Sequence, residues 1–231
     1  MLAAMPAHAD SPVFSVRGLE VNFSPFSVVA EPGERLQLPL SRGSLEGAAF
    51  ADATGVDTVV SSRGLQLSSP QAPGHYPLVL QLTDGQSVKI NLFVTVPVSE
   101  VTENTLNGYK LGPPPPGHPR YPELYRAPEG FIEVSESILD IRLSPHFTLR
   151  QFLSKQRSDY PKYVVVRESL LVMLEGLLAA VNERGYAVDT FGVISGYRTP
   201  WYNRKIGNVP NSRHVYGDAM DLFIDADKDG D

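Results

Sequence analysis

A proline-rich segment over residues 99–130 limits most strongly how this chain can fold. It contains four consecutive prolines at positions 113–116 and the pair Asn107-Gly108. Because proline lacks a backbone N–H and fixes φ, such a segment cannot form a helix or a central strand. We therefore predict a semi-rigid, extended connector between two folded parts. Aromatic residues in and just after it could bind a ligand, but we expect them to pin the connector to a neighbouring domain: Tyr109, Tyr121, Tyr125 and Phe131.

Residues 10–98 have the pattern of an all-β module. Apolar and polar residues alternate in short runs, as at 78–82 and 88–94, and turn signals separate the runs. Asp84-Gly85 lies between two strong runs and predicts a hairpin. Several short strands of this kind predict an immunoglobulin-like sandwich. The module contains no catalytic cluster, so we expect a spacer or a binding module.

Residues 131–231 have an α+β pattern. Thr148 and Thr199-Pro200 are helix-start signals, and Gly185 is suited to the end of a long amphipathic helix. The predicted elements are helix 149–154, helix 166–184, strand 188–194, a short helix from Pro200 that ends before Gly207, and strand 219–224.

The composition restricts the chemistry. The 231 residues include no cysteine, so any metal must be held by His, Asp or Glu, and water is the expected nucleophile. The net charge of −6 argues against a nucleic-acid partner, which needs clustered Lys and Arg.

The segment 212–221 holds the most informative residues. His214 and Asp221 are both competent zinc ligands, and Gly217 between them permits a tight turn that brings them together in a strand-turn-strand. The spacing alone leaves a second interpretation open, in which His214 is an ordinary turn histidine and Asp221 caps a neighbouring element.

A family resemblance favours the first interpretation. Ser195-Gly196-Tyr197-Arg198-Thr199-Pro200, followed by Asn203 and then Ser212-x-His214-x-x-Gly217-x-Ala219-x-Asp221, closely resembles the zinc D-alanyl-D-alanine carboxypeptidase family. These are murein metallopeptidases that share a fold with VanX-type dipeptidases and the hedgehog signalling domain. The resemblance covers about residues 131–231 and includes the run from Leu143 to Leu149. It implies a hedgehog-like zinc domain.

The resemblance also implies roles for individual residues. His214 and Asp221 would be zinc ligands, Arg198 would hold the substrate carbonyl and the developing oxyanion, and Ser212 would help seat the substrate. The implied function is zinc-dependent hydrolysis of peptide bonds in peptidoglycan stem peptides, by a carboxypeptidase or an endopeptidase. Arg198 could instead form a structural salt bridge, and for Ser212 a structural role is equally open.

One expected part of the site has no match. Catalytic zinc takes three protein ligands, and the family takes its third, a histidine, from a later strand with the general base nearby. None of the other histidines fits that position: His8, His75, His118 and His146. The sequence is therefore expected to be a fragment of a longer enzyme. The alternative is a non-catalytic homologue that binds the cell wall or calcium.

The last seven residues resemble the first half of an EF-hand calcium loop, with Asp225, Asp227 and Asp229 as possible ligands. The other interpretation is a solvated acidic terminus.

The first nine residues resemble the end of a signal peptide, with Ala7-His8-Ala9 before the cleavage point. We therefore expect an exported protein of the periplasm or cell envelope. A disordered alanine-rich start is the alternative. No stretch has the roughly 20 apolar residues of a membrane span.

Overall fold

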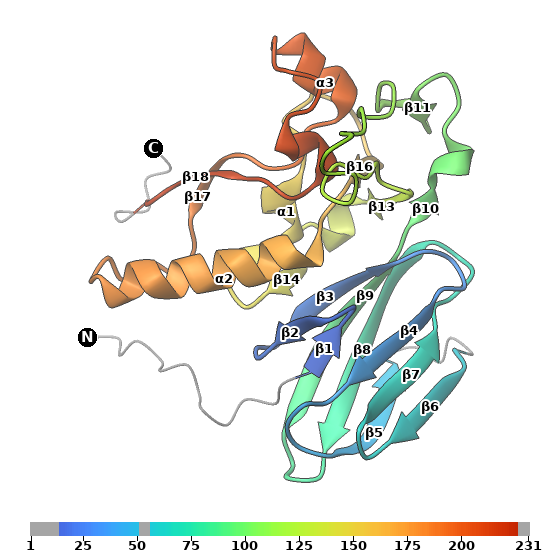
Figure 1. The fold of residues 1–231 in the computed structure, drawn as a ribbon, viewed down its shortest axis with the longest axis vertical. Coiled ribbons are helices and arrows are strands. Elements are labelled where there is room, and N and C mark those ends of the chain that lie inside the picture. The colour runs from blue at the N-terminus through green and yellow to red at the C-terminus, as the bar shows by residue number, and fades with distance from the viewer. Residues whose placement is uncertain (1–13, 51–55, 226–231) are drawn as a thin grey trace.

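The computed structural model of the chain describes residues 14–50 and 56–225. In the described residues, strands make up the N-terminal half, and short strands with three α-helices and short 3-10 helices make up the C-terminal half (Figure 1). One continuous hydrophobic cluster includes buried residues of both halves, from Phe14 to Tyr197. The two halves therefore pack against each other through a shared core. Among the described residues, no helix is long and apolar enough to cross a membrane.

The N-terminal half contains two main sheets and a small hairpin. The strand order is β3-β9-β8-β5 in the first sheet and β4-β7-β6 in the second. All pairs are antiparallel except β3 with β9. The strands are β1 (Phe14–Val16), β2 (Leu19–Val21), β3 (Phe26–Ala30), β4 (Arg35–Pro39), β5 (Leu45–Phe50), β6 (Thr58–Ser61), β7 (Gly64–Ser68), β8 (Gly74–Leu82) and β9 (Ser87–Val94).

The alternating runs produce this arrangement because successive side chains of a strand point to opposite faces. In β4, Leu36 and Leu38 are buried while the residues beside them are exposed. The hairpin predicted at Asp84-Gly85 is confirmed: it joins β8 to β9, and Gly85 has a φ of 84°. The all-β character of this half is therefore as predicted, and its immunoglobulin-like kinship stays a prediction.

The proline-rich segment has little regular structure, as predicted. β10 (Val96–Pro97) and the start of the 3-10 helix η1 (Val98–Glu100) precede it, and it contains β11 (Thr105–Leu106) and β12 (Tyr109–Lys110). Asn107 and Gly108 form the turn between β11 and β12, and both have positive φ. The segment packs on the C-terminal half: the Tyr109 ring lies 5.8 Å from that of Tyr163, and the Tyr125 ring lies 5.2 Å from that of Tyr216. Tyr121, by contrast, is exposed.

The C-terminal half is mixed, with small sheets around helices. β13 joins β10 and β16 in an antiparallel sheet, β14 pairs with β15, and β17 pairs with β18. The elements are β13 (Gly130–Val134), η2 (Glu136–Ile138), β14 (Arg142–Ser144), β15 (Phe147–Thr148), α1 (Leu149–Phe152), β16 (Lys162–Val164), α2 (Glu168–Glu183), β17 (Gly192–Ser195), α3 (Pro200–Lys205), η3 (Arg213–Tyr216) and β18 (Asp221–Phe223).

The helix-start and helix-end residues predicted from the sequence lie at the ends of helices in this half. A capping box at Thr148 starts α1, and the Thr199 hydroxyl accepts a hydrogen bond from the Tyr202 backbone N–H at the start of α3. The long helix α2 ends before Gly185, whose φ is 94°. Its buried face consists of Leu170, Leu171, Leu174 and Leu178.

Three local predictions were wrong. The strand expected from residue 188 begins only at Gly192, and the strand expected from residue 219 begins only at Asp221. The strand expected before Gly217 is a 3-10 helix, η3, in which the Val215 N–H donates to the Ser212 carbonyl. Gly217, with a φ of 75°, ends η3 where the Arg167 N–H donates to its carbonyl. This contact with a distant segment fixes a turn that the local pattern does not indicate.

Candidate metal and peptidase site

His214 lies in η3 and is buried, with 7% of its surface exposed. Its Nδ1 is 2.7 Å from the Gly196 carbonyl oxygen, which can only accept a hydrogen bond. Nδ1 must therefore carry a proton in this contact, and in the neutral form of the ring the lone pair is on Nε2. Nε2 lies 3.3 Å from Asp221 Oδ1.

Asp221 is the first residue of β18 and is paired in register with Ser195 of β17. A register shift between Val193 and Ser195 adds an irregularity at this point. The Asp221 side chain is 46% exposed, so one side of the carboxylate faces solvent while the other faces His214 and Arg198.

Arg198 is the buried cation of the site. Its Nε donates to Ser195 Oγ at 2.8 Å, and its Nη2 donates to Asp221 Oδ2 at 2.5 Å. Its backbone N–H donates to the His214 carbonyl. The salt bridge considered for Arg198 is thus present, and its partner is the predicted ligand Asp221. This ion pair holds the carboxylate with Oδ1 on the His214 side.

Close backbone packing around Gly196 positions these three side chains. A Cβ at Gly196 would lie 2.8 Å from the carbonyl oxygens of Gln151 and Phe152, so only glycine fits there without movement. The next residue, Tyr197, donates its N–H to the Phe152 carbonyl. The end of α1 therefore fixes the carbonyl that orients the His214 ring.

Ser212 lies directly before η3 and is half-buried, and its hydroxyl makes no capping hydrogen bond. Its position two residues before His214 is compatible with the role that the resemblance implies. That role stays a prediction.

The pair fits two positions of a zinc site. A neutral imidazole Nε2 and a carboxylate oxygen are ordinary zinc ligands. Here the hydrogen bond of His214 Nδ1 to the Gly196 carbonyl and that of Arg198 to Asp221 orient both groups toward one point. Within residues 14–50 and 56–225, however, no group of three or more metal-ligating side chains comes together. The pair is thus a partial site.

The other described histidines have partners elsewhere in the fold. His75 bonds Asn91 in the β module, His118 stacks with Tyr121 and with Tyr125, and His146 bonds Glu175. The Glu175 carboxylate raises the pKa of His146 above its ordinary value.

Of the predicted calcium ligands, the structure describes Asp225, while Asp227 and Asp229 lie outside the described residues, as does the predicted signal-peptide remnant. Calcium binding stays a prediction that no contact supports.

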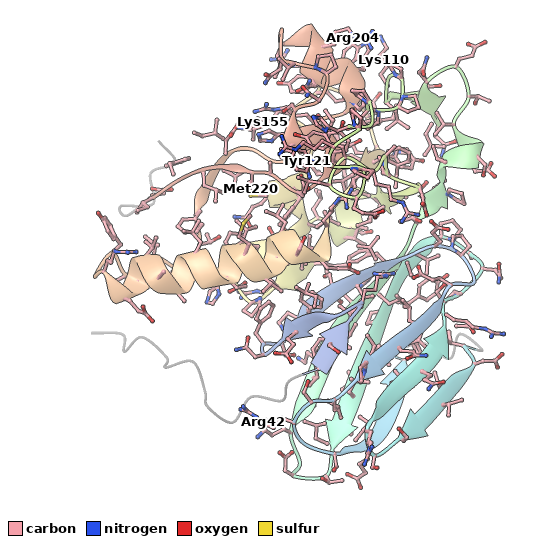
Figure 2. All side chains as sticks on the ribbon, in the orientation of Figure 1. Arg42, Lys110, Tyr121, Lys155, Arg204 and Met220 are labelled. Carbon is pink, nitrogen blue, oxygen red and sulfur yellow. The ribbon has the colours of Figure 1, made fainter. Side chains whose placement is uncertain are left out.

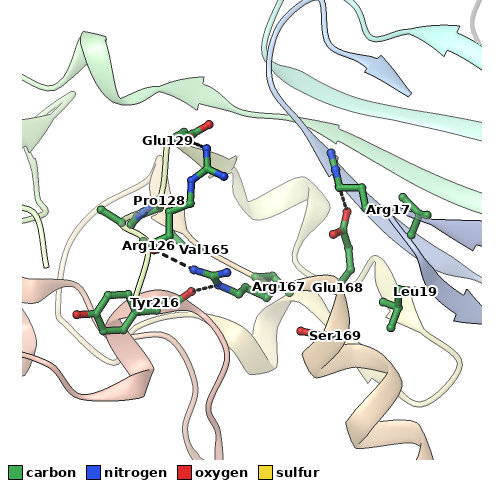
Figure 3. Close-up of a pocket in the computed structure, with 13 residues that line it drawn as sticks. Arg17, Leu19, Arg126, Pro128, Glu129, Val165, Arg167, Glu168, Ser169 and Tyr216 are labelled. Atoms are coloured by element: carbon green, nitrogen blue, oxygen red, sulfur yellow. Dashed lines mark hydrogen bonds and ion pairs between the residues drawn. The ribbon is translucent and has the colours of Figure 1, made fainter. Parts of the chain in front are cut away.

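Arg167 supports the loop that bears the pair, a role that the sequence does not signal. Its backbone N–H donates to the Gly217 carbonyl, and its Nε donates to the Tyr216 carbonyl at 3.2 Å. Figure 3 shows this guanidinium between Arg126 and Tyr216, at the wall of a cavity of about 360 Å³. The cavity lies where the β module, the connector and the start of α2 meet.

Across the same cavity, Arg17 and Glu168 link the two halves (Figure 3). Glu168 Oε1 accepts bonds from Arg17 Nη1 at 2.5 Å and from the Val29 N–H at 3.1 Å. Burial raises the pKa of Glu168, and the nearby Arg17 charge opposes this.

Comparison with known proteins points to the same region. A search of curated proteins finds no match. Residues 145–230 match the family model of peptidase M15, which covers less than half of the chain and includes Arg198, Ser212, His214 and Asp221. The match supports the assignment of this region to the M15 metallopeptidases.

Proposed function

We propose that this protein is a zinc-dependent hydrolase of peptide bonds in the stem peptides of peptidoglycan, as a carboxypeptidase or an endopeptidase. The observation that supports it best is the orientation of His214 and Asp221 toward one point, within the region that matches peptidase M15. Members of that family are typically zinc-dependent, and the residues present are compatible with this metal.

In this proposal His214 and Asp221 would hold the zinc ion. When bound, zinc supplies a Lewis acid that polarises the carbonyl of the scissile peptide bond. The hydrogen bond from His214 Nδ1 to the Gly196 carbonyl fixes the imidazole in the ligating orientation, and the bond from Arg198 fixes the carboxylate.

Arg198 has a second role in the proposal. A guanidinium has five N–H donors, and the bonds to Ser195 and Asp221 use two of them. The others can donate to the substrate carbonyl oxygen as negative charge develops on it. Because Arg198 is already fixed and buried, little reorganisation is needed during the reaction. Ser212 is proposed to seat the peptide.

Hydrolysis further requires a third ligand and a general base from outside the described residues. If they are not supplied, the same pair supports the alternative function, a protein that binds the cell wall without cleaving it. The observation in favour of this alternative is that the described residues bring only two ligands together.

We further propose that the protein is exported to the cell envelope, where its substrate occurs. The N-terminal half would act there as a spacer or binding module. Its two main sheets, of four and three strands, support the immunoglobulin-like kinship.

The test is cleavage of purified peptidoglycan by the intact protein, followed by chromatography of the released peptides. We expect zinc-dependent release that His214→Ala abolishes. His146→Ala is the matched control, because it removes a histidine of the same domain that is paired with Glu175 instead. Unchanged cleavage by His214→Ala would refute the proposed zinc-peptidase function. Retention on peptidoglycan without released peptides, before and after chelation, would support the alternative.

A further inference from the structure

The charge of this chain is distributed unevenly. The protein has a net charge of −6, yet residues 105–122 and 190–217 contain six Lys or Arg and no Asp or Glu. The first segment is the middle of the connector and the second runs from β17 to η3, and the connector packs beside α3 and η3 at the top of Figure 1. These two segments are therefore cationic within an acidic protein.

Two lysines of this region contact one aromatic ring. Lys110 Nζ lies 5.0 Å from the centre of the Trp201 ring, and Lys205 Nζ lies 5.2 Å from it. The Trp201 N–H donates to the Leu111 carbonyl, which fixes α3 against the connector. The two ammonium groups are thus held near each other by the fold.

A buried glutamine brings further cations to this surface. Gln156 Nε2 donates to the Lys110 carbonyl, and Gln156 Oε1 accepts from the Thr199 hydroxyl. Its chain neighbours Lys155 and Arg157 are exposed. Figure 2 shows the labelled Lys110, Lys155 and Arg204 on the lobe around α3.

We name this surface the basic rim and define it by its exposed cations: Lys110, Lys155, Arg157, Arg204 and Lys205. Within the part of the chain that the structure describes, no salt bridge pairs any of them with a carboxylate. The arginines that surround the site behave differently, since Arg198 and Arg213 are paired with Asp221 and Asp218.

The rim adjoins the candidate site. Thr199, which bonds Gln156, directly follows Arg198, and the Arg198 N–H donates to the His214 carbonyl. A molecule whose peptide bond reaches the site therefore comes close to the rim. Unpaired cations around a site raise the local concentration of anionic substrates.

We infer that the basic rim is an accessory binding surface for a peptide that carries several carboxylates, and that the site therefore takes acidic peptides. This inference rests on the proposed function for the identity of the site. An acidic peptide is favoured over a long polyanion such as nucleic acid because the rest of the protein has a strong negative charge, which repels an extended polyanion.

The test uses a fluorescent pentaglutamate peptide and measures its binding to the intact protein by fluorescence anisotropy. We expect binding to weaken on the order of tenfold between 20 and 200 mM NaCl, because exposed charges are screened over this range. The double variant Lys110→Glu/Lys205→Glu should weaken binding at low salt by about tenfold, since it replaces two attractions by two repulsions.

The matched control makes the same charge change in the β module. Arg63 and Lys89 are exposed and lie outside the rim, so Arg63→Glu/Lys89→Glu should reduce binding much less. Equal losses in the two double variants would overturn the inference, because the effect would then come from net charge alone. The uncharged pair Lys110→Gln/Lys205→Gln gives an intermediate loss if charge is the cause.

The outcomes separate the inference from the proposed function. Rim-dependent binding of the peptide without any peptidase activity would leave the inference standing and count against the function. Cleavage of peptidoglycan with no rim-dependent peptide binding would leave the function standing and overturn the inference. The exposed apolar residues Ile206 and Val209 lie near Lys205 in the sequence, and such residues next to cations also suit a membrane surface. Rim-dependent binding to vesicles of anionic lipid, with none to the peptide, would therefore also overturn the inference.

Discussion

A single methyl group added at Gly217 should disturb the candidate site. Gly217 ends η3 after His214 and lies four residues before Asp221. Its φ of 75° is unfavourable for any residue with a Cβ, and a Cβ there would lie 2.5 Å from the Val165 carbonyl oxygen. Gly217→Ala therefore combines backbone strain with a clash against backbone.

The expected loss of unfolding free energy has a part from each of these two causes. The left-handed conformation costs alanine about 1–2 kcal/mol relative to glycine, and an overpacked contact costs about 1–3 kcal/mol. We expect Gly217→Ala to lower the free energy of unfolding by about 2–5 kcal/mol. Gly207 is the matched control: its φ is 76°, but a Cβ there would meet no atom within 4 Å. Gly207→Ala should cost only the backbone part, about 1–2 kcal/mol.

The assay is urea unfolding followed by the fluorescence of Trp201, the single tryptophan of the chain, which lies in α3 next to the site. The difference between the two variants isolates the contact with Val165. Equal unfolding free energies for Gly217→Ala and Gly207→Ala would refute the reasoning, because that contact would then have no energetic effect.

Two further predictions concern charged pairs. Arg17→Met leaves the Glu168 carboxylate with the Val29 N–H as its remaining hydrogen-bond donor. The substitution should therefore lower the free energy of unfolding by about 1–3 kcal/mol at pH 7. This range is reduced from that of a fully buried pair because the Arg17 side chain is 41% exposed. Burial raises the pKa of Glu168, so the loss should shrink as pH falls through that raised pKa; urea unfolding at pH 5 and 7 checks this, and an unchanged loss contradicts it. Glu175→Gln should remove a contribution below about 1 kcal/mol, since His146 is half-exposed. The Glu175 carboxylate raises the pKa of His146 above 6.5, so this contribution is full below pH 6.5 and disappears as pH rises through the raised pKa. Thermal unfolding of the native protein and of Glu175→Gln from pH 5.5 to 8.5 measures this contribution. A stability difference between the two proteins that grows with pH would contradict the prediction.

The elements that the sequence predicts well are those with strong local signals. The start of α3 follows from Thr199-Pro200, and the end of α2 follows from Gly185. The hairpin at Asp84-Gly85 likewise needs only its own turn residues. In each case the residues that determine the structure are adjacent in the sequence.

The wrong predictions occur where contacts between residues far apart in the sequence determine the local structure. η3 was expected as a strand, but its end is fixed by Arg167, whose bond to Tyr216 spans 49 residues. β17 and β18 are shorter than their apolar runs because they form an isolated two-stranded pair with a register shift at Ser195.

The site itself was predictable only in part. The spacing of His214 and Asp221, together with the resemblance, indicates the pair, and the structure places them 3.3 Å apart. The ring orientation depends on the Gly196 carbonyl and on its packing against the end of α1, which no local pattern predicts. The cluster of Lys110 and Lys205 on Trp201 also needs the fold, because it joins the connector to α3.

The most direct test of the central claim is the zinc affinity of the intact protein, measured by competition with a chelating dye. The account predicts that the native protein and His146→Ala bind one zinc ion with equal affinity, and that His214→Ala and Asp221→Ala bind it at least about tenfold more weakly, because each removes a ligand. Equal zinc affinity in all four proteins would contradict the account, since His214 and Asp221 would then not hold the metal.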